Sequence, residues 1–399
     1  MIHVAVFGYG TVGKGVVEVI DRNNEIVSAA SGDKVSVKYI LDLLDFPGDP
    51  NEAKIVHDVN VIINDPEVSI ICETMGGTGA AYKFTKAALE QGKSVCTSNK
   101  ELVAKHGAEL IKLAKANGCA YLFEASVGGG IPVLRTLTTA LTAERITQIA
   151  GILNGTTNFI LTKMEEEGAG FDETLRTAQE LGYAEADPTA DIEGHDTARK
   201  ISILADIMSG HFTDSDNVPT TGITGIDKSD IALASKAGFR IRLLGIADRA
   251  DDDSVSTVVA PFMLSKSHPL VGVNDVFNAI FVTGNMLGET MYYGKGAGSL
   301  ATASAVVADV IDAARKGSST MYPGWDDVPV KAGNAAGEKH RYMVRTDAGN
   351  ADKARALFEG AEEIGGCEGK FGLITGATDK TDISNGIVEI VIEIYEYLI

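Results

Sequence analysis

Short apolar runs alternate with amphipathic segments over the first 125 residues of the chain. The apolar runs are rich in β-branched residues, and they predict strands at residues 2–7, 35–41, 69–72, 94–97 and 120–124. Helical periodicity lies between the runs, at about residues 11–23, 80–91 and 100–117. Because strands and helices alternate, we expect an α/β fold with a doubly wound parallel sheet.

The pattern changes after residue 130, where β-like runs mix with helices. Strands are expected at residues 146–153, 254–260 and 279–283, and a helix of small residues at 302–314. This mixture predicts a second domain of α+β type. The small-residue helix is expected to pack tightly and to return the chain to the first domain.

Composition narrows the classes of function. The chain has 399 residues, of which 45% are hydrophobic, and its formal net charge of −20 disfavours nucleic acid or an anionic membrane as a partner. No uncharged run is long enough to span a membrane and no basic leader is seen, so we expect a cytoplasmic protein. The cysteines lack metal-ligand spacing and are expected to be reduced: Cys72, Cys96, Cys119 and Cys367.

Three glycines, Gly8, Gly10 and Gly13, directly follow the first predicted strand. Glycine allows a tight turn and a close approach of backbone amides to a pyrophosphate. The helix that Thr11 and Val12 open would present its positive end to the same anion. The alternative is a turn that serves packing alone. Because the motif lies between a strand and a helix, ahead of a second strand, we favour a dinucleotide site.

Asp42 ends the second predicted strand, where a carboxylate would hydrogen-bond the ribose hydroxyls of NAD. The crossover that leads to it, about 30 residues, is longer than usual. Residues 43–50 contain no arginine, and their acids would repel a 2′-phosphate. We therefore expect NAD to be preferred over NADP.

A second candidate site combines carboxylates with a lysine. Asp196 and Lys200 are four residues apart, so a helix would place both on one face, beside an apolar stripe. Burial would lower the pKa of Lys200 and the carboxylate would raise it, so this lysine could exchange a proton near neutral pH. The alternative is an ion pair on a solvated helix.

Two further acids, Glu185 and Asp191, precede this helix in a loop interrupted by glycine and proline. Such a group of carboxylates would suit a substrate with an ammonium group, or a divalent cation. Lys100 opens another helix, capped by Ser98 and Asn99, at the carboxyl edge of the predicted sheet. A cation in this position opposes the helix dipole, which favours a bound partner over an ordinary surface lysine.

Two other segments leave alternatives open. Residues 124–132 run from an acid through three glycines to a proline, and predict either a hinge between domains or a site for a monovalent cation. Residues 154–158 read Asn-Gly-Thr-Thr-Asn after a strand. They would bind a carboxylate through amides and hydroxyls, or simply cap a helix.

The order of these motifs resembles that of the homoserine dehydrogenases, from Ile2 to about Arg315. The segments that carry the resemblance are residues 8–13, 97–100, 124–131, 151–158, 182–200 and 294–298. The resemblance implies reversible NAD(P)-dependent reduction of aspartate 4-semialdehyde to homoserine, in the biosynthesis of threonine, methionine and isoleucine. Two other functions stay open: a Rossmann oxidoreductase of another amino-acid aldehyde, and a non-catalytic sensor of NAD or amino acids.

The resemblance also implies roles for the candidate residues. Lys200 would donate the proton, and Lys100 would lie at the junction of cofactor and substrate. Glu185 and Asp196 would bind the substrate, with Asp191 beside them. Further contacts with the dinucleotide would come from Thr74, Gly182 and Gly296. Sodium or potassium would be held by Glu124, Val127, Gly129 and Ile131.

The end of the chain resembles a shortened ACT domain, a small amino-acid-sensing fold. A strand at 341–345, a helix near 351–364, and strands at 371–375 and 387–395 give the order β-α-β-β, which lacks the second helix and the last strand. The final strand would then expose an unpaired edge to another subunit. A homodimer or homotetramer is expected.

The chain is therefore expected to have three parts. A Rossmann-type nucleotide-binding domain spans residues 1–130 and is completed by residues 296–318. A catalytic and dimerisation domain of α+β type spans residues 131–295, and a short ACT-like segment spans residues 335–399.

Overall fold

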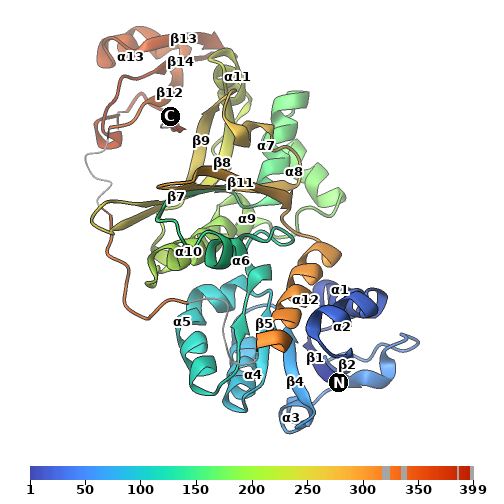
Figure 1. Cartoon of the computed structure of the whole chain (residues 1–399). Helices are drawn as coiled ribbons and strands as arrows, with labels where there is room; N and C mark the ends of the chain where they lie inside the picture. The colour runs from blue at the N-terminus through green and yellow to red at the C-terminus, as the bar shows by residue number, and fades with distance from the viewer. Residues whose placement is uncertain (317–323, 334–338, 384–385, 396–399) are drawn as a thin grey trace.

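The computed structural model describes residues 1–316, 324–333, 339–383 and 386–395, and contains two sheets (Figure 1). The first sheet is parallel throughout, with the order β3-β2-β1-β4-β5-β6. Its strands are β1 (Ile2–Phe7), β2 (Val35–Leu41), β3 (Ile55–Val56), β4 (Val68–Glu73), β5 (Ser94–Thr97) and β6 (Tyr121–Leu122). The strand order reverses between β1 and β4, which is where doubly wound sheets bind ligands. The predicted α/β fold is confirmed.

Helices cover both faces of this sheet. They are α1 (Thr11–Arg22), α2 (Asn24–Ser31), α3 (Val59–Ile63), α4 (Gly79–Glu90) and α5 (Lys100–Ala116). The small-residue helix, α12 (Ser299–Lys316), packs along α1, as predicted. The approach is close, because a Cβ on Gly15 would lie 2.7 Å from the hydroxyl oxygen of Ser299. The last two residues of the predicted 296–318 piece lie outside the described residues.

The second sheet has nine strands in the order β11-β10-β7-β8-β9-β15-β12-β14-β13. The strands of its first half are β7 (Ile146–Ile152), β8 (Phe239–Arg249), β9 (Val255–Ser265), β10 (Phe277–Gly284) and β11 (Gly288–Lys295). Six α-helices of the described residues belong to this part of the chain: α6 (Val133–Arg135), α7 (Gly155–Glu167), α8 (Phe171–Glu180), α9 (Thr189–Ile192), α10 (His195–Ser209) and α11 (Lys228–Lys236). Helix α10 packs on β8 and β9 through buried Ile201 and Leu204, so the predicted apolar stripe faces the sheet.

The C-terminal prediction was wrong in two respects. The helix expected over 351–364 is α13 (Ala351–Leu357), because Gly360 takes a left-handed φ of 81° and the chain continues as a strand, β13 (Glu362–Cys367). The remaining strands are β12 (Tyr342–Asp347), β14 (Lys370–Ile374) and β15 (Ile390–Tyr395). Their order, β15-β12-β14-β13, is that of a four-stranded ferredoxin-like sheet. The last strand of the ACT fold is therefore present. Between β14 and β15 the described residues form an isolated bridge at Thr378 and a 3₁₀ turn at Lys380–Ile383, but no α-helix.

The prediction that the final strand exposes an unpaired edge was also wrong. β15 lies inside the nine-stranded sheet, antiparallel to β12 and parallel to β9. Tyr395 at its end packs against Phe262 and His268, and its hydroxyl donates to Gln148 on β7. Within the described part of the chain, the edges of this sheet are β11 and β13. Because β15 is paired on both sides within the chain, it offers no free edge to another subunit.

A buried charge cluster fixes the C-terminal segment to α11. Arg345 on β12 contacts Asp227 and lies 2.7 Å from Asp230, the two acids of the capping box at the start of α11. Glu389, just before β15, lies 3.3 Å from the same guanidinium. The side chain of Asp230 is fully buried, and burial raises its pKa to about 7 despite the arginine. The segment is thus attached through both backbone pairing and charge.

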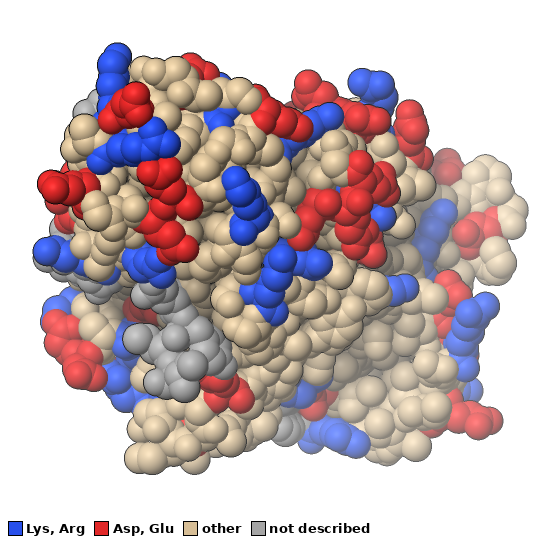
Figure 2. Space-filling model, turned by 90° about the horizontal axis from the view of Figure 1, so that it is seen from above, with Lys and Arg blue, Asp and Glu red and all other residues tan. Residues whose placement is uncertain are grey.

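The outer surface carries mixed charges. Figure 2 views the molecule from the side of the C-terminal segment and shows acidic and basic side chains next to one another on that face. In the described residues, no helix is both long enough and apolar enough to cross a bilayer.

Candidate active site

The glycine turn lies at the carboxyl edge of β1, where the strand order reverses. Gly8 has a left-handed φ of 87°, and a Cβ on Gly13 would lie 1.9 Å from the carbonyl oxygen of Gly8, so the turn requires glycine at both positions. A Cβ on Gly10, in contrast, would meet nothing within 4 Å. No side chain caps the first turn of α1, where Thr11 and Val12 lie. This open space beside free backbone amides fits a pyrophosphate.

Two side chains complete the dinucleotide region. The Asp42 carboxylate accepts from the backbone amide of Tyr9 at 2.7 Å and from that of Leu44 at 3.0 Å. Its place beside the glycine turn is the one predicted for a ribose contact. Thr74, directly after β4, donates to the carbonyl oxygens of Phe7 and Gly8, at 3.0 Å each. The turn after β4 therefore touches the glycine turn, and the contact of Thr74 with the dinucleotide stays a prediction.

Asp196 is shared by two lysines that come from the two domains. Its Oδ2 accepts from Nζ of Lys200, one turn further along α10, at 2.7 Å, and its Oδ1 lies 2.5 Å from Nζ of Lys100 at the start of α5. Helices α5 and α10 pack together, and Arg199 and Glu101 form a second ion pair between them at 2.9 Å. Figure 1 shows α5 below α10 where the two domains meet. The predicted pairing of Asp196 with Lys200 is present, and Lys100 joins it.

The two lysines differ in burial, and their pKa values shift in opposite directions. Lys200 is only 8% exposed, and burial lowers its pKa, which the contact with Asp196 offsets in part. Lys100 is 37% exposed; burial also disfavours its charge, but the Asp196 carboxylate outweighs this effect and raises its pKa. Burial alone would raise the pKa of Asp196, yet the two ammonium groups hold it well below its usual range. Lys200 is therefore the lysine that releases a proton more readily.

Asn154, at the start of α7, contacts both Asp191 and Asp196. It caps α7 by accepting from the amide of Thr157, while its Nδ2 donates to Asp191 at 2.7 Å and to Asp196 at 2.8 Å. Thr156 also donates to Asp191, at 3.2 Å. Burial and the nearby Asp196 raise the pKa of Asp191. Of the two alternatives for residues 154–158, the helix cap is present, made by Asn154 on the amide of Thr157. The carboxylates that the segment contacts are those of Asp191 and Asp196, and the binding of a ligand carboxylate stays a prediction.

The structure does not bring Glu185 into this cluster. Glu185 is exposed in the loop after α8, and its carboxylate makes no hydrogen bond or ion pair to any described residue. Gly182 lies in the same loop with a left-handed φ of 73°. Sequence reasoning missed the backbone carbonyl of Leu153, which accepts from Nζ of Lys200 at 2.7 Å. No side-chain signal could have indicated it.

The glycine segment after β6 meets the end of β11. A Cβ on Gly129 would lie 2.4 Å from the carbonyl oxygen of Gly296, and a Cβ on Gly296 would clash with the amide of Asn278. The buried carboxylate of Glu124 accepts from the amides of Leu134 and Arg135, at 3.0 and 2.7 Å. Both carboxylate oxygens are thus used within the fold.

The predicted cation ligands fit an ion only in part. Besides the engaged Glu124, the carbonyl oxygen of Ile131 accepts from Val133 at 2.8 Å. Val127 is fully buried, and Gly128 and Gly129 turn the chain with positive φ. In the described residues, no group of three or more His, Cys, Asp or Glu side chains is arranged for a metal ion. No step of the chemistry is therefore derived through a cation.

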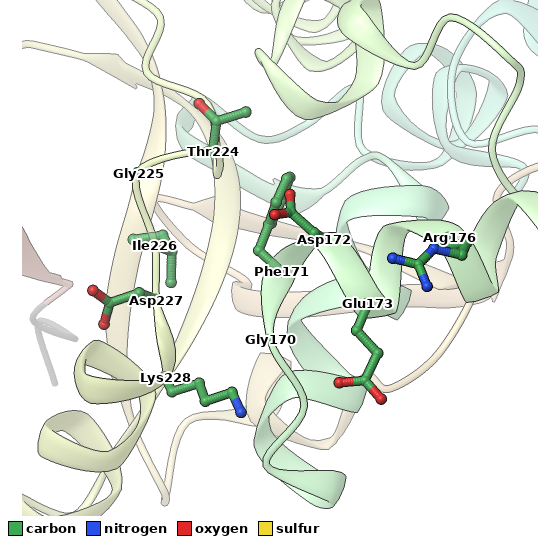
Figure 3. A pocket seen from close by; sticks show the side chains of 10 residues that line it. All are labelled: Gly170, Phe171, Asp172, Glu173, Arg176, Thr224, Gly225, Ile226, Asp227 and Lys228. Atoms are coloured by element: carbon green, nitrogen blue, oxygen red, sulfur yellow. The ribbon is translucent and has the colours of Figure 1, made fainter. Parts of the chain in front are cut away.

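A hollow of about 700 Å³ lies elsewhere, between the start of α8 and the loop before α11 (Figure 3). Asp172, Glu173 and Arg176 line it from α8, and Lys228 lines it from the opposite side. None of its lining residues belongs to the lysine and aspartate cluster. Its chemistry is that of a solvated groove with mixed charges.

Models of two protein families match the two domains in order. Residues 8–124 match the homoserine dehydrogenase NAD-binding domain, and residues 132–311 match the homoserine dehydrogenase family itself. The chain belongs to the homoserine dehydrogenase family. Homoserine dehydrogenase is an NAD(P)-dependent oxidoreductase of amino-acid biosynthesis, and the lysine and aspartate cluster lies where the two matched regions meet.

Individual relatives agree with this assignment. The homoserine dehydrogenase of Bacillus subtilis is 39% identical over 371 residues, which cover 90% of this chain and 84% of the relative. That of Synechocystis is 42% identical over 319 residues, which cover 78% of this chain and 73% of the relative. The solved structure of a homoserine dehydrogenase from Thiobacillus denitrificans superimposes with a TM-score of 0.88 at 35% identity, covering 99% of this chain and 98% of that one. The activity expected from the resemblance is confirmed.

Proposed function

We propose that Lys200 donates the proton in the reduction of aspartate 4-semialdehyde to homoserine, with Lys100 and Asp196 holding the reacting end of the substrate. The single observation that supports these roles is the carboxylate of Asp196 shared between the two lysines, at 2.7 and 2.5 Å. A bound dinucleotide supplies the hydride, and the aldehyde oxygen becomes an alkoxide. The charge of Lys100 stabilises this oxygen, and Lys200 protonates it.

The surroundings of Lys200 suit this task. Its ammonium donates to Asp196 and to the carbonyl oxygen of Leu153, so its position is fixed before substrate binds. Burial lowers its pKa, which makes the proton easier to release than from a lysine in water. In the oxidation of homoserine the same amine accepts the hydroxyl proton. Asp191, held by Asn154, and Glu185 in the exposed loop would receive the substrate's ammonium group.

We expect Asp196→Asn to lower kcat/KM for homoserine by about 10²-fold, because the two ammonium groups lose their common anion and shift apart. Initial rates of reduced dinucleotide formation measure this. Glu101→Gln is a matched control, since Glu101 also bridges α5 and α10 through Arg199 but lies outside the cluster. Equal rates for Asp196→Asn and the control variant would contradict the proposed role.

NAD is proposed as the preferred cofactor. The carboxylate of Asp42 lies at the glycine turn, and Leu44, the next residue but one, offers no charge to a 2′-phosphate. A homoserine dehydrogenase from a hyperthermophilic archaeon has been solved in complex with NADPH, with a TM-score of 0.67 at 29% identity to this chain.

Asp42→Asn should lower kcat/KM with NAD by about tenfold, through the loss of a charged hydrogen-bond acceptor. The value with NADP should stay the same or rise, because the repulsion of the phosphate is removed. Steady-state rates with both cofactors provide the comparison. Asp45→Asn, in the same loop and paired with His57 on the surface, should leave the ratio unchanged. If the ratio of kcat/KM with NAD to kcat/KM with NADP is unchanged in Asp42→Asn, Asp42 does not set the preference for NAD.

Three further assignments remain proposals. We propose that the protein is a homodimer or homotetramer and that it lies in the cytoplasm. The oligomer is supported by the edge strand β11, on which Met291 and Tyr293 are 41% and 53% exposed. The division at residues 1–130 and 131–295, with 296–318 returning to the first part, is supported by the two sheets and α12. A separate segment at 335–399 is supported by the ferredoxin-like order of its four strands, although these continue the second sheet. Sodium or potassium at Glu124, Val127, Gly129 and Ile131 has partial support from the buried turn.

A further inference from the structure

The buried carboxylate of Glu73 has no part in the chemistry described so far. Glu73 is the last residue of β4, next to the strand-order reversal, and its side chain is fully buried. No lysine or arginine of the described structure forms an ion pair with it, so a charge here is costly, and burial raises its pKa to about 7. The hydrogen bonds that its carboxylate accepts indicate what an acid does in this position.

Three segments meet at this carboxylate. Its Oε1 accepts from the backbone amide of Met75 at 2.8 Å, in the turn after β4. Its Oε2 accepts from the hydroxyl of Thr97 at 2.5 Å, at the end of the neighbouring strand β5. The same hydroxyl oxygen accepts from the backbone amide of Asn99 at 2.9 Å. Glu73 therefore connects the turn after β4 to the first residues of α5.

Asn99 extends this network to Lys100. Its Nδ2 donates to the carbonyl oxygen of Gly77 at 2.7 Å, and its Oδ1 caps α5 by accepting from the amide of Leu102 at 3.1 Å. Lys100 is the next residue, and it lies 2.5 Å from Asp196. At the other end of the network, Thr74 donates to the carbonyl oxygens of Phe7, at the end of β1, and of Gly8, in the glycine turn. The buried acid therefore lies between the glycine turn and the helix that begins with Lys100.

We propose that Glu73 is a positioning residue, whose buried carboxylate holds the turn at Thr74–Gly77 and the start of α5 in one arrangement, so that Lys100 meets substrate and dinucleotide together. This inference rests on the role proposed for Lys100. Every group at the carboxylate is a donor, the Met75 amide and the Thr97 hydroxyl among them, so the site is built for an acceptor on each oxygen. An amide or a hydrocarbon would leave a donor without its partner.

The test uses Glu73→Gln and Thr97→Val, which keep the volume but break the network on either side of the same hydrogen bond. Each should lower kcat by about ten- to a hundredfold, because a shift of the order of 1 Å in Lys100 is enough for such a loss. The KM for homoserine should change little, since Asp191 on α9 and Asp196 on α10 are untouched. The melting temperature should fall by only a few degrees, the cost of one buried hydrogen bond. NAD affinity, measured by titration calorimetry, should weaken by no more than a few-fold. Glu109→Gln, on the exposed face of α5, should match the wild type.

The double variant decides between positioning and general stability. If Glu73 acts through Thr97, the loss in kcat for Glu73→Gln with Thr97→Val should be close to that of either single variant. Multiplied losses, or a loss that follows only the melting temperature, would overturn the inference. Lys100→Met separates the two proposals. If it retains full kcat, the role of Lys100 fails; if it loses kcat while Glu73→Gln does not, only the positioning role of Glu73 fails.

Discussion

Replacing Lys200 with methionine is expected to lower kcat for homoserine oxidation by about 10²–10⁴-fold, the range typical for loss of a general acid or base. The amine is the group that the fold has prepared for this task, since it is buried, fixed by Leu153 and Asp196, and has a lowered pKa. Methionine fills similar space without a charge, so the packed surface of α10 should survive. NAD affinity should stay within a few-fold, because the glycine turn lies in the other domain.

The measurement is a steady-state assay of the reduced dinucleotide in both directions, with titration calorimetry for NAD. Lys86→Met is the control, as this lysine pairs with Glu109 on the surface of the nucleotide domain and should behave like the wild type. A Lys200→Met enzyme that keeps more than about a tenth of wild-type kcat would show that the proton comes from elsewhere.

Replacing Arg345 with alanine should destabilise the protein by about 3–5 kcal/mol, the cost typical of removing one partner of a buried ion pair. Arg345 is the only cation that the structure shows in contact with Asp230, among the described residues, and it also contacts Asp227. Glu389 is shared between Arg345 and Lys370. Because the cluster joins β12 to α11, the loss should loosen the C-terminal strands. We expect the catalytic sheet to be affected with them, since β15 lies between β9 and β12.

The destabilisation caused by Arg345→Ala should increase with pH. Burial raises the pKa of Asp230 from 3.8 to about 7, so this acid costs stability increasingly as pH rises from about 4 to 7. Without the arginine, the pKa of Asp230 rises further. The difference in unfolding free energy between the wild type and Arg345→Ala should therefore be larger at pH 8 than at pH 5. Urea unfolding at both values measures this. Arg341→Ala, which removes an exposed pair with Glu362, should cost at most about 1 kcal/mol. Equal destabilisation by the two variants would refute the role of the cluster.

The first domain could be predicted from the sequence because its signals are local. The strand before Gly8, the glycine turn and the caps at Asn99 each occupy neighbouring residues, and their geometry follows from short-range preferences. The pairing of Asp196 with Lys200 follows from helix periodicity alone. Lys100 was placed at the correct edge of the sheet, but its contact with Asp196 required two domains to pack.

The errors lie where distant segments pair. Gly360 separates α13 from β13, and β13, which contains Gly365 and Gly366, has too few apolar residues to be recognised as a strand. The position of β15 between β9 and β12 depends on tertiary packing, which periodicity within one segment does not encode. The same limit applies to Asn154 and Glu73, whose roles come from their partners and not from their neighbours in sequence.

The pairing of β15 with β9 also bears on biosynthesis. Glu393 lies opposite Phe262, so a ribosome that has completed β9 must add about 130 residues before the neighbouring strand can emerge. Until then, the β9 edge is exposed in the nascent chain, with apolar residues such as Phe262 and Leu264 along it. This interval is the period in which a chaperone would have most to protect, and in which premature termination would leave a chain prone to aggregate.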